Sequence, residues 1–483
     1  MLSTAEIKRF IEDDISSEKK RLAAVGQRYY EADHDIRKHR MFYFNAEGEL
    51  VEDKARSNIK ISHPFFTELA DQLASYMLSF KENPIRAKEN VDGLQEQLDL
   101  YFDDDFWAEV SELITGAYTK GFDYLYAYKG EDNRLKFECA DSMGVVEVRE
   151  QDTDDGCKYV IYWYIDRIEK GRKKVKRIQV WSENETYYYT QIDSGSIELD
   201  SSAPVNPRPH VVFTDKKGNK MGYGLGFIPF WRLDNCKKQF NGLKPIKALI
   251  DDYDLMMCGL SNNLADFDTP LHVVSGYEGD DLTELQQNLK TKKIVGVDSE
   301  GDVQIRTVDI PYEARKAKAD EDEKNIYRFG FGFNSAQVGD GNVTNVVIRS
   351  RYTLLDLKAN KMEKRLRQLL KQVLKVILAE INAEFKKDYQ IGDIYFEFTR
   401  DIMTNETENI QNAKVEAETR QIEVNTVLNV AANVGDEQVL KAICEIMEWD
   451  FEELEGELEK LNEGQSTAAA QTVLDGVVVE GDE

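Results

Sequence analysis

The stretch from Tyr312 to Phe329 most constrains what this chain can fold into. Its composition is helical, it mixes acidic and basic side chains, and it is nearly free of aliphatic residues. A helix that belongs to a monomer core carries an apolar stripe along one face, and this stretch has none. The pattern therefore predicts a helix that cannot be a core element of a monomer and that needs neighbours, which we expect to be other subunits.

A second helix is predicted upstream, so that a small insert lies between two helices. Pro245 suits the first turn of this helix, and Asp268-Thr269-Pro270 ends it. The insert, residues 271–311, predicts α/β structure with four elements. These are a strand at Leu271–Val274, a helix around Leu282–Leu289, and strands at Lys293–Val297 and Val303–Ile310. The insert should form a tip on a two-helix stalk.

The first half of the chain predicts helices followed by a β-rich module. Ser3 and Glu6 have capping-box spacing, a second helical stretch begins at Ser17, and Pro64 suits the first turn of a third helix. A further helix follows Asp103-Asp104-Asp105 and stops near Gly121. Six β-rich stretches come next: Phe122–Tyr128, Arg134–Cys139, Val145–Arg149, Tyr159–Ile165, Val175–Trp181 and Thr186–Ile192. We expect one antiparallel β module and hence an α+β fold.

Charge is distributed unevenly along the chain. The net charge is −28, and residues 401–483 hold 21 acids and 4 bases, a balance of −17. A glycine-rich stretch, Gly330–Asn342, leads into a long predicted helix that ends near Glu384. Between Asn345 and Ile377 this helix carries nine bases and two acids. We interpret the basic run as a solvated face or as salt bridges to acids of an adjacent subunit; proximity of its first arginines to DNA is the competing hypothesis.

Composition and motifs exclude several classes of protein. A hydrophobic content of 41% excludes a disordered or fibrous chain. No run approaches the roughly 20 apolar residues of a membrane span, and the N-terminus has no basic segment followed by an apolar one, so we expect neither a membrane protein nor an exported one. The five cysteines are scattered without a CxxC or Cys/His cluster, which favours a reducing compartment.

No catalytic, cofactor-binding or metal-binding site is predicted. Asp251, Asp252 and Asp254 are the best candidates for a metal-dependent nucleic-acid-processing enzyme, because two-metal chemistry needs clustered carboxylates. No matching Glu/Lys partner accompanies them, so a solvated helix face is the preferred interpretation. The five histidines are scattered and are expected to be surface or ordinarily packed residues: His34, His39, His63, His210 and His272. The enzyme stays open as an alternative.

Several short motifs in a fixed order carry a resemblance to a known family. They are Asn58-Ile59-Lys60, Pro64-Phe65-Phe66, Tyr76-Met77-Leu78, Asn83-Pro84-Ile85, Gly226-Phe227-Ile228-Pro229, Ala248-Leu249-Ile250-Asp251 and Gly341-Asn342-Val343-Thr344. With the insert between two helices, this order resembles that of the portal proteins of siphovirus-type tailed bacteriophages over roughly residues 20–460. The resemblance implies a non-enzymatic ring subunit at one capsid vertex that acts in genome packaging, head–tail joining and DNA ejection. A head-completion adaptor is the other alternative.

The resemblance also implies a division of the chain, with a portal fold of arm, wing, stem, clip and crown. The expected parts are an N-terminal helical arm (1–55), a wing of helices and an antiparallel β module (56–245), stem helices (246–270 and 312–332) and a small α/β clip (271–311). They continue with a tunnel loop (333–347), a long helix of the wing and crown (348–395) and an acidic helical crown (396–463). Composition alone predicts a disordered tail over 464–483.

Partners and location follow from the resemblance in the same way. The implied partners are other copies of the chain in a ring of twelve, double-stranded DNA that passes through without sequence preference, and the terminase large subunit. Scaffold and major capsid proteins and a head–tail adaptor are implied as well. We expect no cofactor and no membrane, and a place in the virion, at the portal vertex of the capsid, after assembly in the host cytoplasm.

The tunnel loop supplies the candidate site. We expect a polar and apolar collar around the duplex, formed by Phe333, Asn334, Ser335, Gln337, Val338, Gly339, Asp340, Asn342, Val343 and Thr344. Arg349 and Arg351 would lie just behind this collar as DNA-proximal bases. A conduit must hold DNA without gripping it, because each contact of a Lys or Arg with a phosphate adds affinity that sliding would have to break.

Overall fold

The computed structural model describes residues 1–447 and residue 451, with a number of gaps. The gaps are residues 55, 90, 131–133, 150–155, 215–219, 268–270, 278–280, 282, 284, 286–296, 307–310, 335–344, 401–405, 432–433 and 448–450. The chain divides into two compact units, residues 1–338 with 350–401 and residues 339–349 with 402–483. Helices and strands both contribute substantially, and the α+β prediction is confirmed.

The N-terminal segment contains two capped helices and a β-hairpin. α1 (Thr4–Ser16) begins with the predicted capping box of Ser3 and Glu6, and α2 (Glu18–Tyr30) begins at Ser17. A short 3₁₀ turn, η1 (Asp35–Lys38), precedes β1 (Phe42–Phe44) and β2 (Leu50–Glu52), which pair antiparallel. The segment 1–55, which was expected as a helical arm, therefore also contains a hairpin, in which Asn45 and the left-handed Gly48 (φ 78°) close a tight turn between the two strands.

The β-rich part forms two main sheets, where a single module was expected. One sheet has the order β10-β9-β8-β7-β6 with β11 beside β9, and the other has the order β14-β4-β5. Their strands are β4 (Phe122–Lys129), β5 (Leu135–Ala140), β6 (Val145–Val148), β7 (Tyr159–Glu169), β8 (Lys173–Trp181), β9 (Glu185–Ile192), β10 (Ile197–Leu199), β11 (Arg208–Pro209) and β14 (Phe230–Asp234). β12 (Val211–Thr214) and β13 (Lys220–Tyr223) form a separate hairpin.

The larger sheet is buried on both faces, which explains why its strands are apolar at successive positions. Ile161 lies in a cluster with Ile7 and Ile11 of α1, while its neighbour Val160 lies in a second cluster with Phe122 of β4. Successive side chains of a strand point to opposite faces. α1 therefore covers one face of this sheet, and the smaller sheet covers the other.

A helical layer completes the first unit. Its elements are α3 (Phe65–Met77), β3 (Ile85–Ala87), α4 (Leu94–Asp99), α5 (Asp104–Lys120), α9 (Asn345–Phe385), η4 (Ile391–Asp393) and β17 (Ile394–Phe396). α5 begins at Asp103, whose carboxylate accepts the N–H of Phe106, and ends at the left-handed Gly121. β17 pairs with β3, which joins the segment after α9 to the segment before α4.

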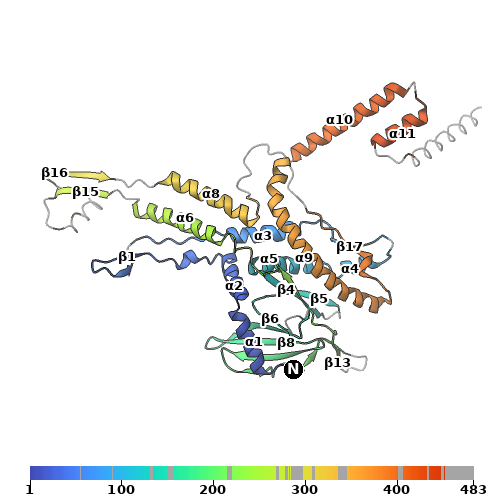
Figure 1. Cartoon of the computed structure of the whole chain (residues 1–483), viewed down its shortest axis with the longest axis horizontal. Coiled ribbons are helices and arrows are strands. Elements are labelled where there is room, and N and C mark those ends of the chain that lie inside the picture. The colour runs from blue at the N-terminus through green and yellow to red at the C-terminus, as the bar shows by residue number, and fades with distance from the viewer. Residues whose placement is uncertain are drawn as a thin grey trace, which may run out of the picture. The chain divides into compact units, whose positions relative to one another are not determined.

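The predicted stalk and tip are present as a helix pair and a two-stranded sheet. α6 (Lys247–Phe267) and α8 (Tyr312–Gly330) lie side by side, with β15 (Leu271–Tyr277) and β16 (Val297–Arg306) beyond them (Figure 1). The sequence predicted two strands here, at 293–297 and 303–310. The structure has one continuous strand, β16, because residues 298–302 extend it across a bulge in its pairing with β15. Most of the helix expected over 282–289 falls outside the described residues.

In the second unit, the described residues include the helices α10 (Glu406–Val430) and α11 (Asp436–Met447). Both fall in the segment that was expected to be acidic and helical. The tail expected to be disordered, residues 464–483, lies outside the described residues.

Candidate functional site

The end of α8 lies against α3 so closely that it leaves no room for side chains at two positions. A Cβ on Gly330 would lie 2.6 Å from the Leu69 side chain, and one on Gly332 would lie 2.0 Å from it. The Gly330 carbonyl accepts the Tyr118 hydroxyl (3.2 Å), and the Gly332 N–H donates to the Tyr327 carbonyl (2.9 Å). These glycines are therefore required by the close approach of the chain to α3.

The next residue is held by one side chain of α3. Gln72 accepts the N–H of Phe333 (3.0 Å) and donates its amide to the Phe333 carbonyl (2.7 Å). Asn334 donates to Glu323 of α8 at 2.8 Å. The backbone that enters the segment 335–344 is thus fixed in position and direction.

The chain that follows this segment returns to the same place. Phe333 stacks on Tyr352 of α9, with ring centroids 4.6 Å apart and an angle of 16°. Tyr352 in turn lies beside Tyr76 of α3, with 5.6 Å between their rings. Burial and the hydrogen bond to Asp356 raise the pKa of Tyr76 to about 12. Residues on both sides of the segment 335–344 are therefore anchored on α3 through aromatic rings.

The contacts of α8 correct the expectation that it could not be a monomer core element. Ile326 and Tyr327 are buried, and Tyr327 packs edge-on against Phe65 and donates to Glu68 at 2.5 Å. Toward the middle of the helix, Lys318 pairs with Asp252 of α6 at 2.6 Å. The first turns of α8 are exposed, so contact with other subunits stays a prediction for that part.

Side chains on one face of α6 hold an extended segment as a neighbouring strand would. Four positions spaced by four residues each accept a backbone N–H from alternate residues of the segment 57–63. The pairs are Asp254 with His63 (2.9 Å), Cys258 with Ile61 (3.1 Å), Asn262 with Ile59 (2.6 Å) and Asp266 with Ser57 (3.1 Å). Four helical residues rise about 6.0 Å and two strand residues about 6.6 Å, so the two repeats stay in step.

We call these four hydrogen bonds between α6 and residues 57–63 the ladder. Its first acceptor, Asp254, is a buried carboxylate between two histidines. Asp254 is fully buried, and its two oxygens contact Nδ1 of His34 (2.6 Å) and Nδ1 of His63 (2.7 Å). Burial raises the pKa of this carboxyl, but hydrogen bonds from His34 and His63 more than offset that effect, so its pKa lies below the ordinary value. The cluster ties α6 to the segments before and after the β1–β2 hairpin.

The basic run on α9 is partly paired within the chain. Arg367 pairs with Glu363 at 2.6 Å, whereas Asp356, the other acid of the run, pairs at 2.9 Å with Arg400, which lies beyond the helix. Lys358 donates to Asn235 at 2.5 Å and lies over the Tyr118 ring. Burial, with nearby Lys361, lowers the pKa of Lys358 to about 8.

We expect the stability of this region to rise with pH above about 8 because of Lys358. In that range the unfolded chain binds more protons than the folded chain, since the folded pKa is the lower one. Lys358→Met should abolish this rise in the free energy of unfolding, which amounts to up to about 2 kcal/mol. Melting temperatures between pH 7 and pH 9.5 measure the effect, with Lys375→Met, an exposed lysine of the same helix, as the control. Equal pH profiles for wild type and Lys358→Met would contradict it.

Comparison with known proteins identifies the family of this chain. Residues 9–465 match the family model described as phage portal protein, SPP1 Gp6-like. The chain belongs to this portal protein family. It is 26% identical over 391 residues to the portal protein of Bacillus phage SPP1, covering 80% of this chain and 76% of that protein. It is also 23% identical over 364 residues to the portal protein of Clostridium phage phiCD119, covering 69% of this chain and 76% of that protein.

Membership of the portal family confirms the resemblance seen in the sequence and decides between the alternatives. Portal proteins are structural, non-enzymatic components of the virion and form ring oligomers in phage capsids; roles in genome packaging and as a head–tail connector follow from that identity. The enzyme and the head-completion adaptor are therefore set aside.

The acidic triplet on α6 has a structural role in this portal protein. The solvated face expected for it is wrong for Asp254, and Asp251 is held by Tyr29 and by Lys247, the latter at 2.6 Å. Within the described part of the chain, no group of three or more His, Cys, Asp or Glu side chains could hold a metal ion. None of the described helices is both long and apolar enough to cross a membrane.

The expected DNA-facing residues divide into described and undescribed ones. Phe333 and Asn334 are half-buried, and their contacts are made within the subunit. Arg349 is exposed near the start of α9, and Arg351 lies in the same helix. The remaining members lie outside the described residues: Ser335, Gln337, Val338, Gly339, Asp340, Asn342, Val343 and Thr344. Approach of this set to DNA stays a prediction.

Sequence reasoning missed the residues that position the loop. Gln72, Tyr352 and Leu69 contact it from two helices that are far apart in sequence, and no local pattern connects them. The acceptors on α6 left a weak signal, because Asp254, Cys258, Asn262 and Asp266 have a regular spacing of four.

Proposed function

We propose that this chain is the ring subunit of a DNA conduit at one vertex of a tailed-phage capsid. Twelve copies surround a channel through which the terminase large subunit drives double-stranded DNA during packaging, and through which the DNA leaves on ejection. Scaffold and major capsid proteins incorporate the ring in the host cytoplasm, and a head–tail adaptor joins it later. The observation that carries this proposal is the family match, which spans the chain from residue 9 to residue 465.

The described elements support an assignment of parts. We assign α6 and α8 to the stem, β15 and β16 to the clip, residues 333–347 to the tunnel loop and the β-rich sheets to the wing. We place the start of the crown after residue 401, where the division between the two compact units falls. In this assignment the loop that faces DNA is attached at the inner end of the stem helix α8 and is braced by α3.

The charge of the chain agrees with a conduit for DNA. A net charge of −28 disfavours tight binding to phosphates, and two bases of α9, Arg367 and Lys358, already have partners within the chain. DNA inside such a ring would meet a few side chains of the tunnel loop and would remain free to slide. The bases Arg349 and Arg351 belong to the start of α9, next to the tunnel loop in sequence, which is why we propose them as the DNA-proximal bases.

Particle shape tests the proposal. The purified full-length chain should form rings with a central hole in negative-stain images, and native mass spectrometry should give twelve subunits or a neighbouring number. Capsids assembled with it should hold the ring at a single vertex, which an antibody against an added epitope tag would show. A monomer at all concentrations, or a compact particle without a hole, would contradict the proposal.

A further inference from the structure

One face of α9 carries four lysines that have no acidic partner among the described residues. Lys361, Lys364, Lys371 and Lys375 are exposed and recur at helical spacing, and none of them makes an ion pair within the described part of the chain. The opposite face of the helix buries Met362, Leu366, Leu369, Val373 and Ile377. This lysine face is therefore presented to solvent by a helix that is firmly packed on its other side.

A complementary face lies at the α4–α5 corner of the same chain. Glu96, Asp99, Asp104, Asp105 and Glu112 are all exposed, and none of them makes an ion pair with a described base. Each face carries charges of one sign that are not neutralised within the subunit. The like charges on a face repel one another, and binding of a surface of opposite charge would relieve that repulsion. We call this the acidic face.

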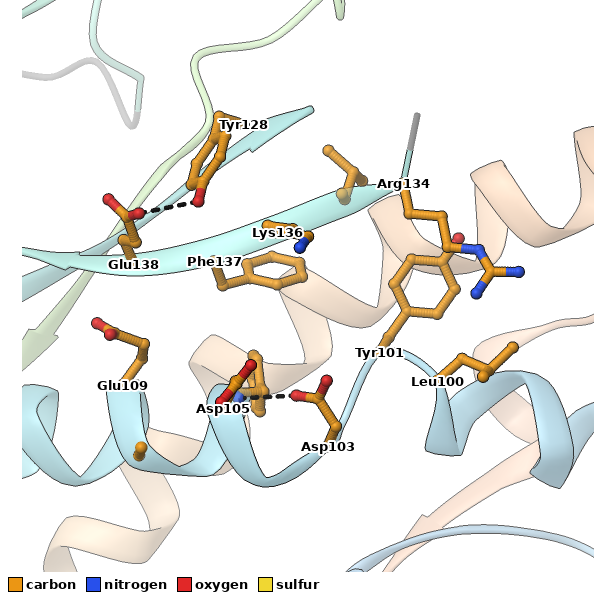
Figure 2. A pocket seen from close by; sticks show the side chains of 13 residues that line it. Leu100, Tyr101, Asp103, Asp105, Glu109, Tyr128, Arg134, Lys136, Phe137 and Glu138 are labelled. Atoms are coloured by element: carbon orange, nitrogen blue, oxygen red, sulfur yellow. Dashed lines mark hydrogen bonds between the residues drawn. The ribbon is translucent and has the colours of Figure 1, made fainter. Parts of the chain in front are cut away.

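A cavity adjoins the acidic face and gives it shape. It has a volume of about 370 Å³ and lies between the start of α5 and β5 (Figure 2). Asp105 and Glu109 line one wall, and the exposed Leu100 lies at the edge. Arg134, Lys136 and Glu138 lie along the β5 wall, so this wall carries both signs of charge, whereas Asp105 and Glu109 make the α5 wall acidic. The stem of a long side chain could enter here beside apolar rings while its charge meets carboxylates.

The two faces also match in spacing. Asp105 and Glu112 lie seven residues apart on α5, and Lys364 and Lys371 lie seven residues apart on α9. Seven helical residues span about 10.5 Å, so two such helices can pair both charges at once.

We propose that the lysine face of α9 in one subunit docks on the acidic face of the next subunit around the ring. The inference rests on the ring assembly of the proposed function.

A second copy of the chain fits this pattern better than a nucleic acid does. A contact between two different faces of identical subunits passes from each copy to the next, which is the type of interface that closes into rings. DNA on the lysine face would leave the acidic face of every subunit unpaired. Opposite charges on facing surfaces also fix which sides of two copies meet and disfavour wrong pairings.

Zero-length crosslinking of the wild-type rings tests the contact without any substitution. A carbodiimide joins an amine to a carboxylate only when the two are in contact. Mass spectrometry of the crosslinked dimer band should find peptides with Lys364 or Lys371 joined to peptides with Asp105 or Glu112. A dimer band in which these lysines are linked only to carboxylates outside the α4–α5 corner would overturn the proposal.

A charge exchange tests it by function. Lys364→Glu with Lys371→Glu, and separately Asp105→Lys with Glu112→Lys, should each lower the association constant of the subunit interface about tenfold, which corresponds to a loss of roughly 1.4 kcal/mol per interface and should strongly reduce the ring fraction. All four substitutions in one chain should restore rings to within about twofold of wild type, because every interface then has reversed but opposite charges. Lys170→Glu with Lys173→Glu, on exposed residues in the β7–β8 turn and at the start of β8, is the matched control and should assemble normally.

The outcomes separate this contact from the proposed function. Normal rings from both double variants, or no recovery in the fourfold variant when circular dichroism shows it to be folded, would overturn the docking contact and leave the conduit standing. Rings that stay intact while the lysine variant loses retention of a DNA fragment would assign the face to nucleic acid instead. Wild-type protein that never forms rings would count against the proposed function itself.

Discussion

Deletion of Ser335–Asn342 is expected to leave rings intact and to lower the DNA packaged per capsid by about tenfold or more. The anchors of the loop, Gln72 with Phe333 and Tyr352 with Tyr76, lie outside the deleted residues, so the subunit should fold as before. In the proposed conduit the duplex would then lose the side chains that we expect to lie closest to it, and its passage during packaging would be impaired. Protection of capsid DNA from nuclease measures the loss.

The control for this deletion is a substitution in α8, the helix that precedes the loop, which leaves the loop itself unchanged. Asn325→Ala removes a side chain of α8 that bonds to Glu321 one turn away, at 3.1 Å, and should package normally. Rings should be counted for both variants before packaging is compared, since a loss of rings would point to assembly. Normal packaging by intact rings of the deletion variant would contradict a role of the tunnel loop at the duplex.

Asp254→Ala is expected to lower the free energy of unfolding of the first unit by about 3 to 5 kcal/mol, as the loss of one partner of a buried charged cluster does. The substitution leaves the buried His34 ring, the partly exposed His63 ring and the His63 N–H without their acceptor. It also removes one end of the ladder that holds residues 57–63 on α6. Denaturant unfolding of the purified chain, followed by tryptophan fluorescence, measures the change.

The neighbouring Asp252 supplies the matched control for this substitution. Asp252 is half exposed and pairs with Lys318, so Asp252→Ala should cost less than about 1 kcal/mol. The stabilisation from Asp254 is present above the ordinary carboxyl pKa and is lost as the pH falls below it, because the folded pKa is the lower one. Asp254→Ala should therefore be less sensitive to acid than wild type. Equal unfolding free energies for the two alanine variants would refute the role given to Asp254.

Local patterns in the sequence predicted individual elements well. Ser3 and Glu6 form the capping box, Ser17 caps α2, and Asp103 caps α5, because each of these interactions lies within a few residues of the chain. Strands were also placed correctly where apolar and turn residues alternate. Their division into two sheets was missed, since pairing between β14 and β4 joins residues that are more than a hundred positions apart.

Long-range contacts limited the prediction of the site. Asp254 was interpreted as part of a solvated face because its histidine partners, His34 and His63, are about two hundred residues away and carry no motif. The polar helix α8 was expected to depend on other subunits throughout, yet Ile326 and Tyr327 are enough to bury its last turns against α3 and α6. The order of segments and the few family motifs nevertheless led to the portal family.

The most direct test of the central claim is to ask whether the tunnel loop touches DNA during packaging. A photoreactive amino acid at Val338, and for comparison at Glu198, which is exposed after β9, would be placed in rings within capsids stalled part-way through packaging. The account predicts that irradiation crosslinks DNA to position 338 and leaves position 198 free of DNA. Crosslinking that is absent at 338, or equal at the two positions, would contradict a conduit lined by this loop.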